Sequence, residues 1–435
     1  MREVFEQLIL DFHNSKLPVP SKREINILPL SENVRKAYIF IGMRRSGKTW
    51  TMYQRMNELL SQGLDKTKLL YINFEDDRLI SMQTKDFQSI LDAYFGLYPQ
   101  YLERQDLYFF FDEIHEIKGW EQFTRRILDQ EKMHIYISGS SAKLLGKEIA
   151  SALRGRTIVT EVFPFSFREY LNFEGLSLSK KLSTKEKAMI SHCMKDFLQY
   201  GGFPEAVSLD KRFFNDLLQG YIDSVIYRDI VERYNISNVH AIRELITFCL
   251  QNLSSLISIN KIYHTFKSQG QSIGKNSLYE FMGYLEDAYC IFSVPIFSHS
   301  RRKQVVNPKK IYGVDQGFIT AYTVKPQFEE ASRLENAVFC RLRQSVENIF
   351  YYKTKKGGEI DFLTVMPHGK MALYQASVSI ADKKTYDREV SALTQAMEEL
   401  SVKEGIIVTL NDKKTITLKK RTIQCIPAWQ WLTEQ

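Results

Sequence analysis

The sequence lacks the features that would place the chain outside the cytoplasm. Its five cysteines are far apart and form no C-x-x-C pair, so we expect reduced, buried thiols. No run of about 18 uncharged apolar residues occurs, and the first residues show neither a basic start nor a long apolar stretch. These absences predict a soluble cytoplasmic protein with no signal peptide and no membrane partner.

A strong excess of charge of one sign is also missing. The net charge of +8 is mildly basic, which permits a polyanionic partner without requiring one. His115 and Glu116 do not form an H-E-x-x-H motif, so the sequence gives no indication of zinc. A length of 435 residues is too great for a single core and predicts about two to four domains.

One complete motif is present. Residues 42–49 read GMRRSGKT and match the phosphate-binding loop G-x-x-x-x-G-K-[ST] at every fixed position. The apolar run 37–41 before it predicts a buried strand, and apolar residues at helical spacing follow over 49–60. Strand, glycine loop and helix are the context that this motif needs, so the sequence predicts a P-loop NTPase core with a parallel sheet.

The spacing of the motif explains its chemistry. Glycines let backbone N–H groups form a concave nest for anions, and a helix N-terminus adds the positive end of its dipole. We expect Lys48 to reach the β- and γ-phosphates of ATP and Thr49 to hold Mg²⁺. The predicted nucleotide contacts in this segment are Gly42, Met43, Arg44, Arg45, Ser46, Gly47, Lys48, Thr49 and Trp50.

Two acidic residues end a later apolar strand. Five apolar residues at 107–111 precede Asp112 and Glu113, as in a strand that is buried on both faces. Acids at the carboxyl end of such a strand lie where open α/β sheets place their ligands. We expect Asp112 to hold Mg²⁺ and Glu113 to serve the attacking water, a role worth roughly 10²–10⁴ in rate.

Two further contributions to the site stay open. Ser138 and Ser140 lie at the end of the strand expected over 134–141, where a polar group can touch the γ-phosphate or the water. The alternative is a helix N-cap by Ser140 or Ser141. Arg156 could supply charge to the γ-phosphate of its own subunit or of a neighbour in a homo-oligomer. The alternative is a structural ion pair with an acid such as Glu161.

Several further motifs follow in a fixed order: 71–76 (YINFED), 112–114 (DEI), 138–141 (SGSS), 155–156 (GR), 164–167 (PFSF), 200–205 (YGGFPE) and 227–230 (YRDI). With them the chain resembles the bacterial and archaeal AAA-like ATPases that carry a C-terminal domain of unknown function. The resemblance implies an AAA/ASCE-type core at 30–175 after an N-terminal extension at 1–29, then a helical lid at 176–257.

Residues 258–325 resemble a winged helix. A helix that reads DNA should present several basic or amide side chains, but here Lys275 and Asn276 stand beside Glu280 and Glu286, which favours a packing role. A basic segment follows, and it is a candidate contact for a nucleic-acid backbone, with a solvated β-hairpin as the alternative. Its cations are Arg301, Arg302, Lys303, Lys309 and Lys310.

The last segment, 326–435, resembles the restriction-endonuclease-like PD-(D/E)XK fold. Glu335, Asp361 and Gln375 follow the order in which that family places its Mg²⁺ ligands, but Ser377 stands at the lysine position. Glutamine is a weak ligand for a hard cation, and serine has no ammonium group, although Lys383 or Lys384 could substitute. We therefore predict a degenerate nuclease-like α/β domain that binds nucleic acid or a protein partner.

The leading hypothesis is a multidomain α/β ATPase coupled to this C-terminal domain. The alternatives are a nucleotide-dependent switch with little turnover, an ATP-dependent nuclease or defence effector, and a DNA-binding regulator.

Overall fold

The computed structural model divides the chain into two compact units, Met1–Val162 and Phe163–Gln435. It describes residues 1–25, 27, 36–103, 106–130, 133–139, 153, 155–178, 182–271, 273–323, 329–418 and 420–434. Among these residues, no helix combines the length and the apolar character that a membrane-spanning segment needs.

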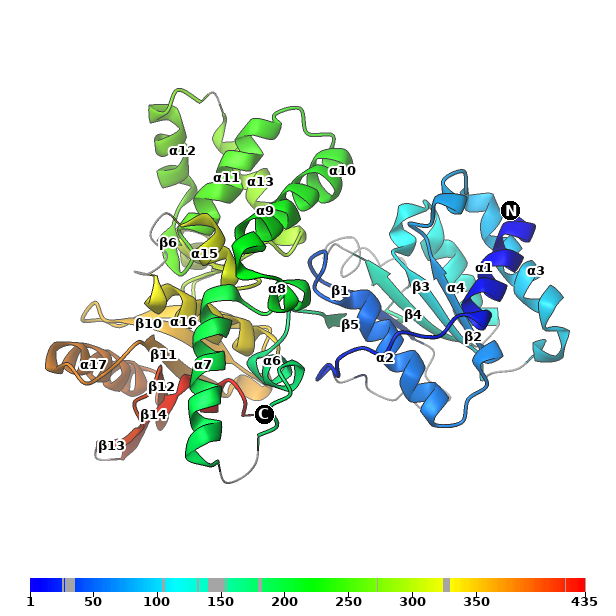
Figure 1. Ribbon diagram of the computed structural model, residues 1–435. Coiled ribbons are helices and arrows are strands. Elements are labelled where there is room, and N and C mark those ends of the chain that lie inside the picture. Colours follow the sequence, from blue (N-terminus) through cyan, green and yellow to red (C-terminus); the bar gives the residue numbers. More distant parts are fainter. Residues whose placement is uncertain are drawn as a thin grey trace. The chain divides into compact units, whose positions relative to one another are not determined.

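A five-stranded parallel sheet forms the centre of the first unit (Figure 1). Its strands, in spatial order, are β2 (Leu69–Asn73), β3 (Tyr108–Asp112), β4 (His134–Gly139), β1 (Ala37–Ile41) and β5 (Thr157–Glu161). β4 pairs with both β1 and β3, so it is inserted between them. The strands expected from the apolar runs are therefore confirmed, and the carboxyl ends of β1, β3 and β4 meet at one edge.

Helices cover both faces of this sheet because its central strands are apolar on both sides. The helices are α1 (Arg2–Asn14), α2 (Lys48–Ser61), α3 (Gln88–Leu97) and α4 (Trp120–Gln130). Phe110 of β3 lies in the core that contains Met52 and Met56 of α2. Phe109 contacts Tyr94 of α3, and Phe111 contacts Phe123 of α4. Successive β3 residues thus point to opposite faces, and the sheet holds the loop and the acids rigidly.

The second unit begins with helices. These are α6 (Phe167–Phe173), α7 (Thr184–Tyr200), α8 (Pro204–Ser208), α9 (Phe214–Ser224), a π-helical stretch (Val225–Val231), α10 (Glu232–Tyr234) and α11 (Val239–Gln251). Capping boxes at Ser166 and Ser183 begin α6 and α7.

A three-stranded antiparallel sheet follows, in the order β6 (Ser255–Ile257), β8 (Lys309–Gly313), β7 (Ile291–Val294). The helices of this region are α12 (Ile259–Ser268), α13 (Lys275–Asp287), α14 (Arg301–Val306) and α15 (Gly317–Tyr322). β7 and β8 pair as expected for a hairpin, but the basic residues 301–303 lie on α14 in the connection between them.

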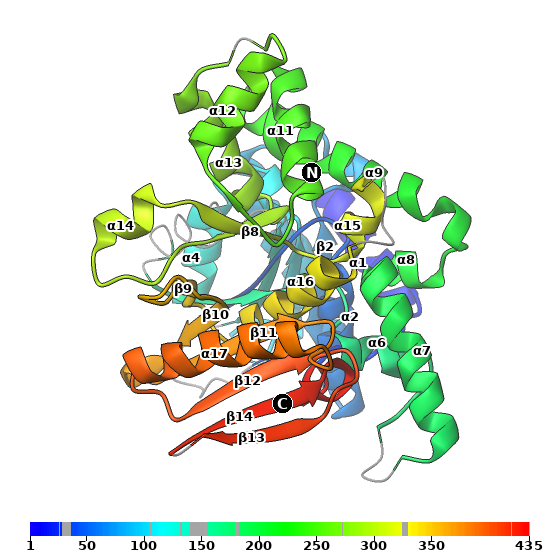
Figure 2. The ribbon, with the colours of Figure 1, turned by 90° about the vertical axis from the view of Figure 1, so that its left-hand side faces the viewer.

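The unit ends in a six-stranded mixed sheet with a helix on each face (Figure 2). Its strands, in spatial order, are β13 (Lys414–Leu418), β14 (Arg421–Pro427), β12 (Glu404–Thr409), β11 (Met371–Ser377), β10 (Glu359–Val365) and β9 (Ile349–Lys353). α16 (Glu330–Arg343) and α17 (Lys383–Glu399) contribute to two separate apolar cores, and α18 (Ala428–Trp431) ends the chain. Along the chain, α16 is followed by the antiparallel strands β9, β10 and β11. α17 then leads to β12, which pairs with β11 in parallel.

Candidate nucleotide-binding site

The loop between β1 and α2 has the backbone geometry of an anion-binding turn. Gly42 (φ 150°) and Gly47 (φ 103°) adopt positive φ values that glycine accommodates without strain. A Cβ atom on Gly42 would lie 2.3 Å from the carbonyl oxygen of Val162, which leaves no room for a side chain. α2 begins at Lys48, directly after Gly47, so the positive end of the helix dipole faces the loop.

The polar atoms of the loop turn inward. Lys48 is buried, and its Nζ donates to the carbonyl oxygens of Gly42 and Met43, both at 3.2 Å. The Ser46 hydroxyl is buried and has no hydrogen-bond partner. A buried hydroxyl without a partner is costly, and a phosphate oxygen would supply one. The donors of this loop therefore fit the phosphates of a nucleotide.

Asp112, at the end of β3, is held by two hydroxyl groups. Tyr71 of β2 donates to its Oδ2 at 2.9 Å, and Ser138 of β4 donates to its Oδ1. Ser138 also accepts a hydrogen bond from the backbone N–H of Glu113 at 3.0 Å. Ser138 therefore lies within β4, at the edge expected from the sequence, and fixes both acidic residues. Oxygen ligands of this kind, with Thr49 at the start of α2, suit Mg²⁺.

Glu113 has an unusual backbone and an unusual carboxyl group. Its φ of 51° is left-handed, which is uncommon for a residue other than glycine. Burial raises the pKa of the Glu113 carboxyl to about 7, partly offset by Lys48, whose Nζ lies 3.7 Å from Oε1. His115 lies on the other side, with its Nδ1 3.3 Å from Oε2. A carboxyl group with a pKa near 7 is suited to accept a proton at neutral pH.

The remaining predicted loop residues lie around this centre. Met43 is fully buried, and Thr49 is half-buried at the start of α2. Arg44 pairs with Glu75 at 3.0 Å. Arg45 is exposed, as is Trp50, whose ring lies edge-on to that of Tyr53.

The structure describes Arg156 but not Ser140, the two residues whose roles the sequence left open. Arg156 forms an ion pair with Asp129, so in this structure its guanidinium is engaged by an acid on α4. Ser140 lies outside the described residues.

The second group of predicted residues lies in the second unit. Asp361 of β10 and Gln375 of β11 are neighbours: the Asp361 N–H donates to Gln375 Oε1 at 3.1 Å, and the Ala376 N–H donates to Asp361 Oδ2 at 3.0 Å. Ser377 does not join them, because its hydroxyl donates to the Ser379 carbonyl. Among the residues that the structure describes, no group of three or more acidic, histidine or cysteine side chains is arranged to hold a metal ion.

The prediction that Lys310 lies on a basic surface is wrong. Its side chain is only 4% exposed, and its Nζ lies 2.8 Å from Asp361 Oδ1 and 3.1 Å from Glu335 Oε1. β8 turns this residue inward, so Lys310 cannot reach a phosphate backbone. Lys383 and Lys384, the two lysines considered as substitutes at the carboxylates, are exposed at the start of α17.

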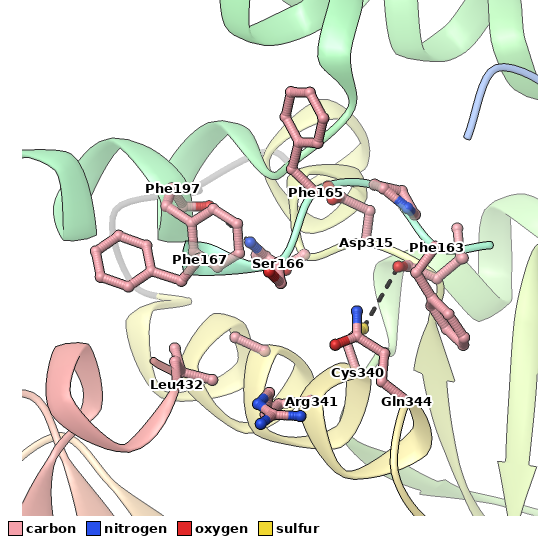
Figure 3. Close-up of a pocket in the computed structure, with 14 residues that line it drawn as sticks. Phe163, Phe165, Ser166, Phe167, Phe197, Asp315, Cys340, Arg341, Gln344 and Leu432 are labelled. Carbon is pink, nitrogen blue, oxygen red and sulfur yellow. Dashed lines mark hydrogen bonds between the residues drawn. The ribbon is translucent and has the colours of Figure 1, made fainter. Parts of the chain in front are cut away.

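Two of the short motifs, 164–167 and 200–205, meet at Asp315 inside the second unit; Figure 3 shows Phe165 and Asp315 of this junction. Asp315, which is buried, accepts hydrogen bonds from the N–H groups of Gly202 and Gly317, both at 2.7 Å. The Gly202 carbonyl in turn accepts from the Phe165 N–H at 2.7 Å. A Cβ atom on Gly201 would lie 1.7 Å from the Asp315 carboxylate, so the paired glycines are needed for this contact. These motifs therefore form a packed junction around one carboxylate.

Comparison with known proteins places the chain among uncharacterised relatives. The uncharacterized protein MJ1544 of Methanocaldococcus jannaschii is 32% identical over 98% of this chain and 95% of its own length. The chain belongs to the family of this protein. A family model described as an AAA domain matches residues 34–171, and a domain of unknown function, DUF8612, matches residues 192–328. An uncharacterized protein of Haemophilus influenzae is 28% identical over 75% of the chain and 78% of its own length.

Solved structures show a weaker likeness. The Aeropyrum pernix ORC1 protein in complex with DNA has 13% identity and a TM-score of 0.28 over 74% of this chain and 90% of its own. AMPPCP-bound DnaA from Aquifex aeolicus has 14% identity and a TM-score of 0.25, over 65% of this chain and 86% of its own. At such TM-scores these likenesses carry no functional inference.

Two residues of the first unit that contact the candidate site in the AAA domain were not predicted from the sequence. Arg23, which is buried, donates from its guanidinium to the Ser46 carbonyl at 3.0 Å. It precedes the AAA domain and belongs to no motif, so the sequence held no signal for it. Tyr71 belongs to the YINFED motif, but the sequence did not predict its hydrogen bond to Asp112. This contact depends on the pairing of β2 with β3.

Proposed function

We propose that the AAA domain binds ATP with Mg²⁺ and hydrolyses it, and that the second unit couples this cycle to a partner. The observation that carries the proposal is the position of Glu113. Its buried carboxyl lies 3.7 Å from the ammonium of Lys48, directly after Asp112, at the edge of the sheet where β1 presents the loop. Hydrolysis of a terminal phosphate requires a group that orients or deprotonates the attacking water and a cation that neutralises the phosphate charge, and Glu113 and Lys48 supply both beside the loop.

Each residue of the site has a role in this proposal. The loop N–H groups, Lys48 and the Ser46 hydroxyl would bind the phosphates in place of the carbonyl contacts that Lys48 now makes. Thr49 and Asp112 would hold Mg²⁺, which neutralises phosphate charge when it is bound with ATP. Glu113 would take the proton of the attacking water.

Ser138 positions this base, because its hydroxyl binds both the Asp112 carboxylate and the Glu113 N–H. The two acids therefore cannot move independently of β4. We expect Arg156 to contribute to turnover only if its pair with Asp129 opens, in its own subunit or in a neighbouring one.

Two variants test the hydrolytic role. Lys48→Ala should lose nucleotide binding, because it removes the only lysine of the phosphate loop. Glu113→Gln keeps the shape of the base but cannot accept the proton, so it should bind ATP while turnover falls roughly 10²- to 10⁴-fold. The measurements are equilibrium binding of a fluorescent ATP analogue and phosphate release at saturating ATP.

Glu116→Gln is the matched control for Glu113→Gln. Glu116 lies three residues further on, its side chain is 41% exposed, and its Oε1 is 3.5 Å from His115. Its turnover should equal that of the wild type. Normal turnover in Glu113→Gln would remove Glu113 as the base, and very slow turnover in the wild type itself would favour a nucleotide-dependent switch.

A second role is favoured by the surface of α14. Arg301, Arg302 and Lys303 are exposed on it, and Val305 and Val306 are 69% and 73% exposed beside them. We propose that this helix contacts a nucleic-acid backbone, since clustered cations bind phosphates and release counterions.

A further inference from the structure

Lys310 lies at the centre of three carboxylates contributed by two elements. Its Nζ is 2.8 Å from Asp361 Oδ1, 2.9 Å from Glu359 Oε1 and 3.1 Å from Glu335 Oε1. Glu359 and Asp361 are two positions apart on β10, so they share one face of the sheet, and Glu335 reaches them from α16. The lysine arrives from β8, a strand of the three-stranded sheet.

The ammonium is fully used by these contacts. A lysine has three N–H donors and no acceptor, and here three carboxylate oxygens lie within hydrogen-bond distance of it. No donor remains for a phosphate or for a water molecule that could attack one. Lys310 therefore differs from a catalytic lysine, which must reach the reacting groups.

Charge explains why the cation is needed. Buried carboxylates without a counter-ion are very unfavourable, and the side chains of Glu335 and Asp361 are only 15% and 10% exposed. Burial and the neighbouring Asp361 raise the pKa of Glu335, although Lys310 and the Tyr312 hydroxyl, 2.7 Å from Oε1, oppose this. Burial alone would lower the pKa of Lys310, but the three acids outweigh it and raise that pKa.

Other charged groups around the cluster do not replace Lys310. Lys353 lies 3.8 Å from Glu359 Oε2 and is 46% exposed. Glu389 of α17 contacts the amide of Gln375 at 2.6 Å and pairs with Arg388, which is 71% exposed. Gln375 thus links a fourth acid to the cluster without adding a cation.

We propose that Lys310 is a built-in cation that occupies the position of a divalent metal ion among Glu335, Glu359 and Asp361, so that the wild-type protein binds no metal there and cleaves no nucleic acid. The ammonium instead ties β8 to α16 and β10. This proposal does not depend on ATP hydrolysis, because every residue in it belongs to the second unit.

Titration of the full-length protein with Mn²⁺ tests the proposal, with binding measured by calorimetry. Lys310→Ala removes the charge together with the side chain that fills the position, so it should bind one more Mn²⁺ per chain than the wild type. Adding Asp361→Asn to Lys310→Ala should abolish the extra site. Lys309→Ala is the matched control, since Lys309 is the half-buried neighbour on the same strand, and it should not gain a site.

Three results would overturn the proposal. One is Mn²⁺ binding by the wild type that Asp361→Asn removes; another is Mn²⁺-dependent DNA cleavage by the wild type that Asp361→Asn abolishes. The third is a folded Lys310→Ala protein that gains no Mn²⁺. If Lys310→Ala does not fold, Lys310→Ala/Glu359→Gln carries one acid fewer and should fold and gain the site. Failure of that folded variant to bind Mn²⁺ counts equally against the proposal.

Discussion

Two lysines of this protein are buried to the same extent but contact different groups. The side chains of Lys48 and Lys310 are each 4% exposed. Lys48 donates to carbonyl oxygens of its own loop and lies 3.7 Å from one carboxylate. Lys310 lies within 3.1 Å of three carboxylates. Burial is therefore the same in both places, and the difference lies in the partners.

This difference separates a lysine whose partners a phosphate could replace from a lysine whose partners are all carboxylates. Backbone carbonyls are neutral acceptors, so the charge of Lys48 is only partly compensated and an incoming phosphate can replace them. Carboxylates compensate Lys310 fully, and the hydrogen bonds of its ammonium are complete. A buried lysine thus indicates a functional site only when its partners can be exchanged.

The largest expected effect is a difference in stability between Lys310→Met and Lys48→Met. Removing one partner from a buried ionic cluster typically costs about 3–5 kcal/mol, so Lys310→Met should lower the free energy of unfolding by that amount. Lys48→Met loses hydrogen bonds to carbonyls, which are worth about 1 kcal/mol each. Urea denaturation in the absence of nucleotide measures the free energy of unfolding of both variants. Equal decreases in the two variants would contradict the proposed difference between the two lysines.

An intermediate effect concerns the acid next to Lys48. The pKa of Glu113 in the folded protein, about 7, lies above its value in the unfolded chain. The free energy of unfolding therefore decreases as the pH rises from about 4 to 7. Glu113→Gln removes this loss and should stabilise the nucleotide-free protein at pH 8 by up to about 3 kcal/mol. Urea denaturation at pH 5 and pH 8 gives the test, with exposed Glu116→Gln as the control. If Glu113→Gln raised the free energy of unfolding equally at both pH values, the raised pKa of Glu113 would be contradicted.

The smallest effect on stability is expected on α14. Arg301→Ala/Arg302→Ala/Lys303→Ala removes exposed charges and should change the free energy of unfolding by less than about 0.5 kcal/mol. If the helix contacts a nucleic acid, the slope of log affinity against log salt should fall by roughly 2–3. Fluorescence anisotropy with labelled duplex DNA at several salt concentrations measures the slope. Absence of DNA binding by the wild type at low salt would exclude the contact.

The elements that carry the candidate nucleotide site could be predicted from the sequence because each of them is local, whereas nucleotide binding itself stays a prediction. A strand, a glycine loop and a helix are contiguous, and Asp112 and Glu113 directly end an apolar run. The strand that became β4 also followed from its apolar run, but its position between β1 and β3 is known only from the strand pairings. Arg23 escaped because its contact with Ser46 joins residues 23 positions apart that share no pattern.

The second carboxylate cluster shows what a sequence pattern leaves out. Glu335, Asp361 and Gln375 were recognised from their order, but Lys310 is 25 positions from Glu335 and 51 from Asp361. It follows a run of exposed cations, so its charge suggested a surface. Only the pairing of β8 with β6 and β7 turns it inward. Charge patterning along the chain cannot distinguish a solvated lysine from the counter-ion of a distant cluster.

The position of Lys310 also limits how this chain can be divided. A fragment that begins at residue 326 would contain Glu335, Glu359 and Asp361 but not their ammonium. It would carry three acids, two of them buried, without the cation that another sheet supplies, and we expect such a fragment not to fold independently. We therefore expect the six-stranded sheet to be transferable to another protein only together with β8, which carries its ammonium group.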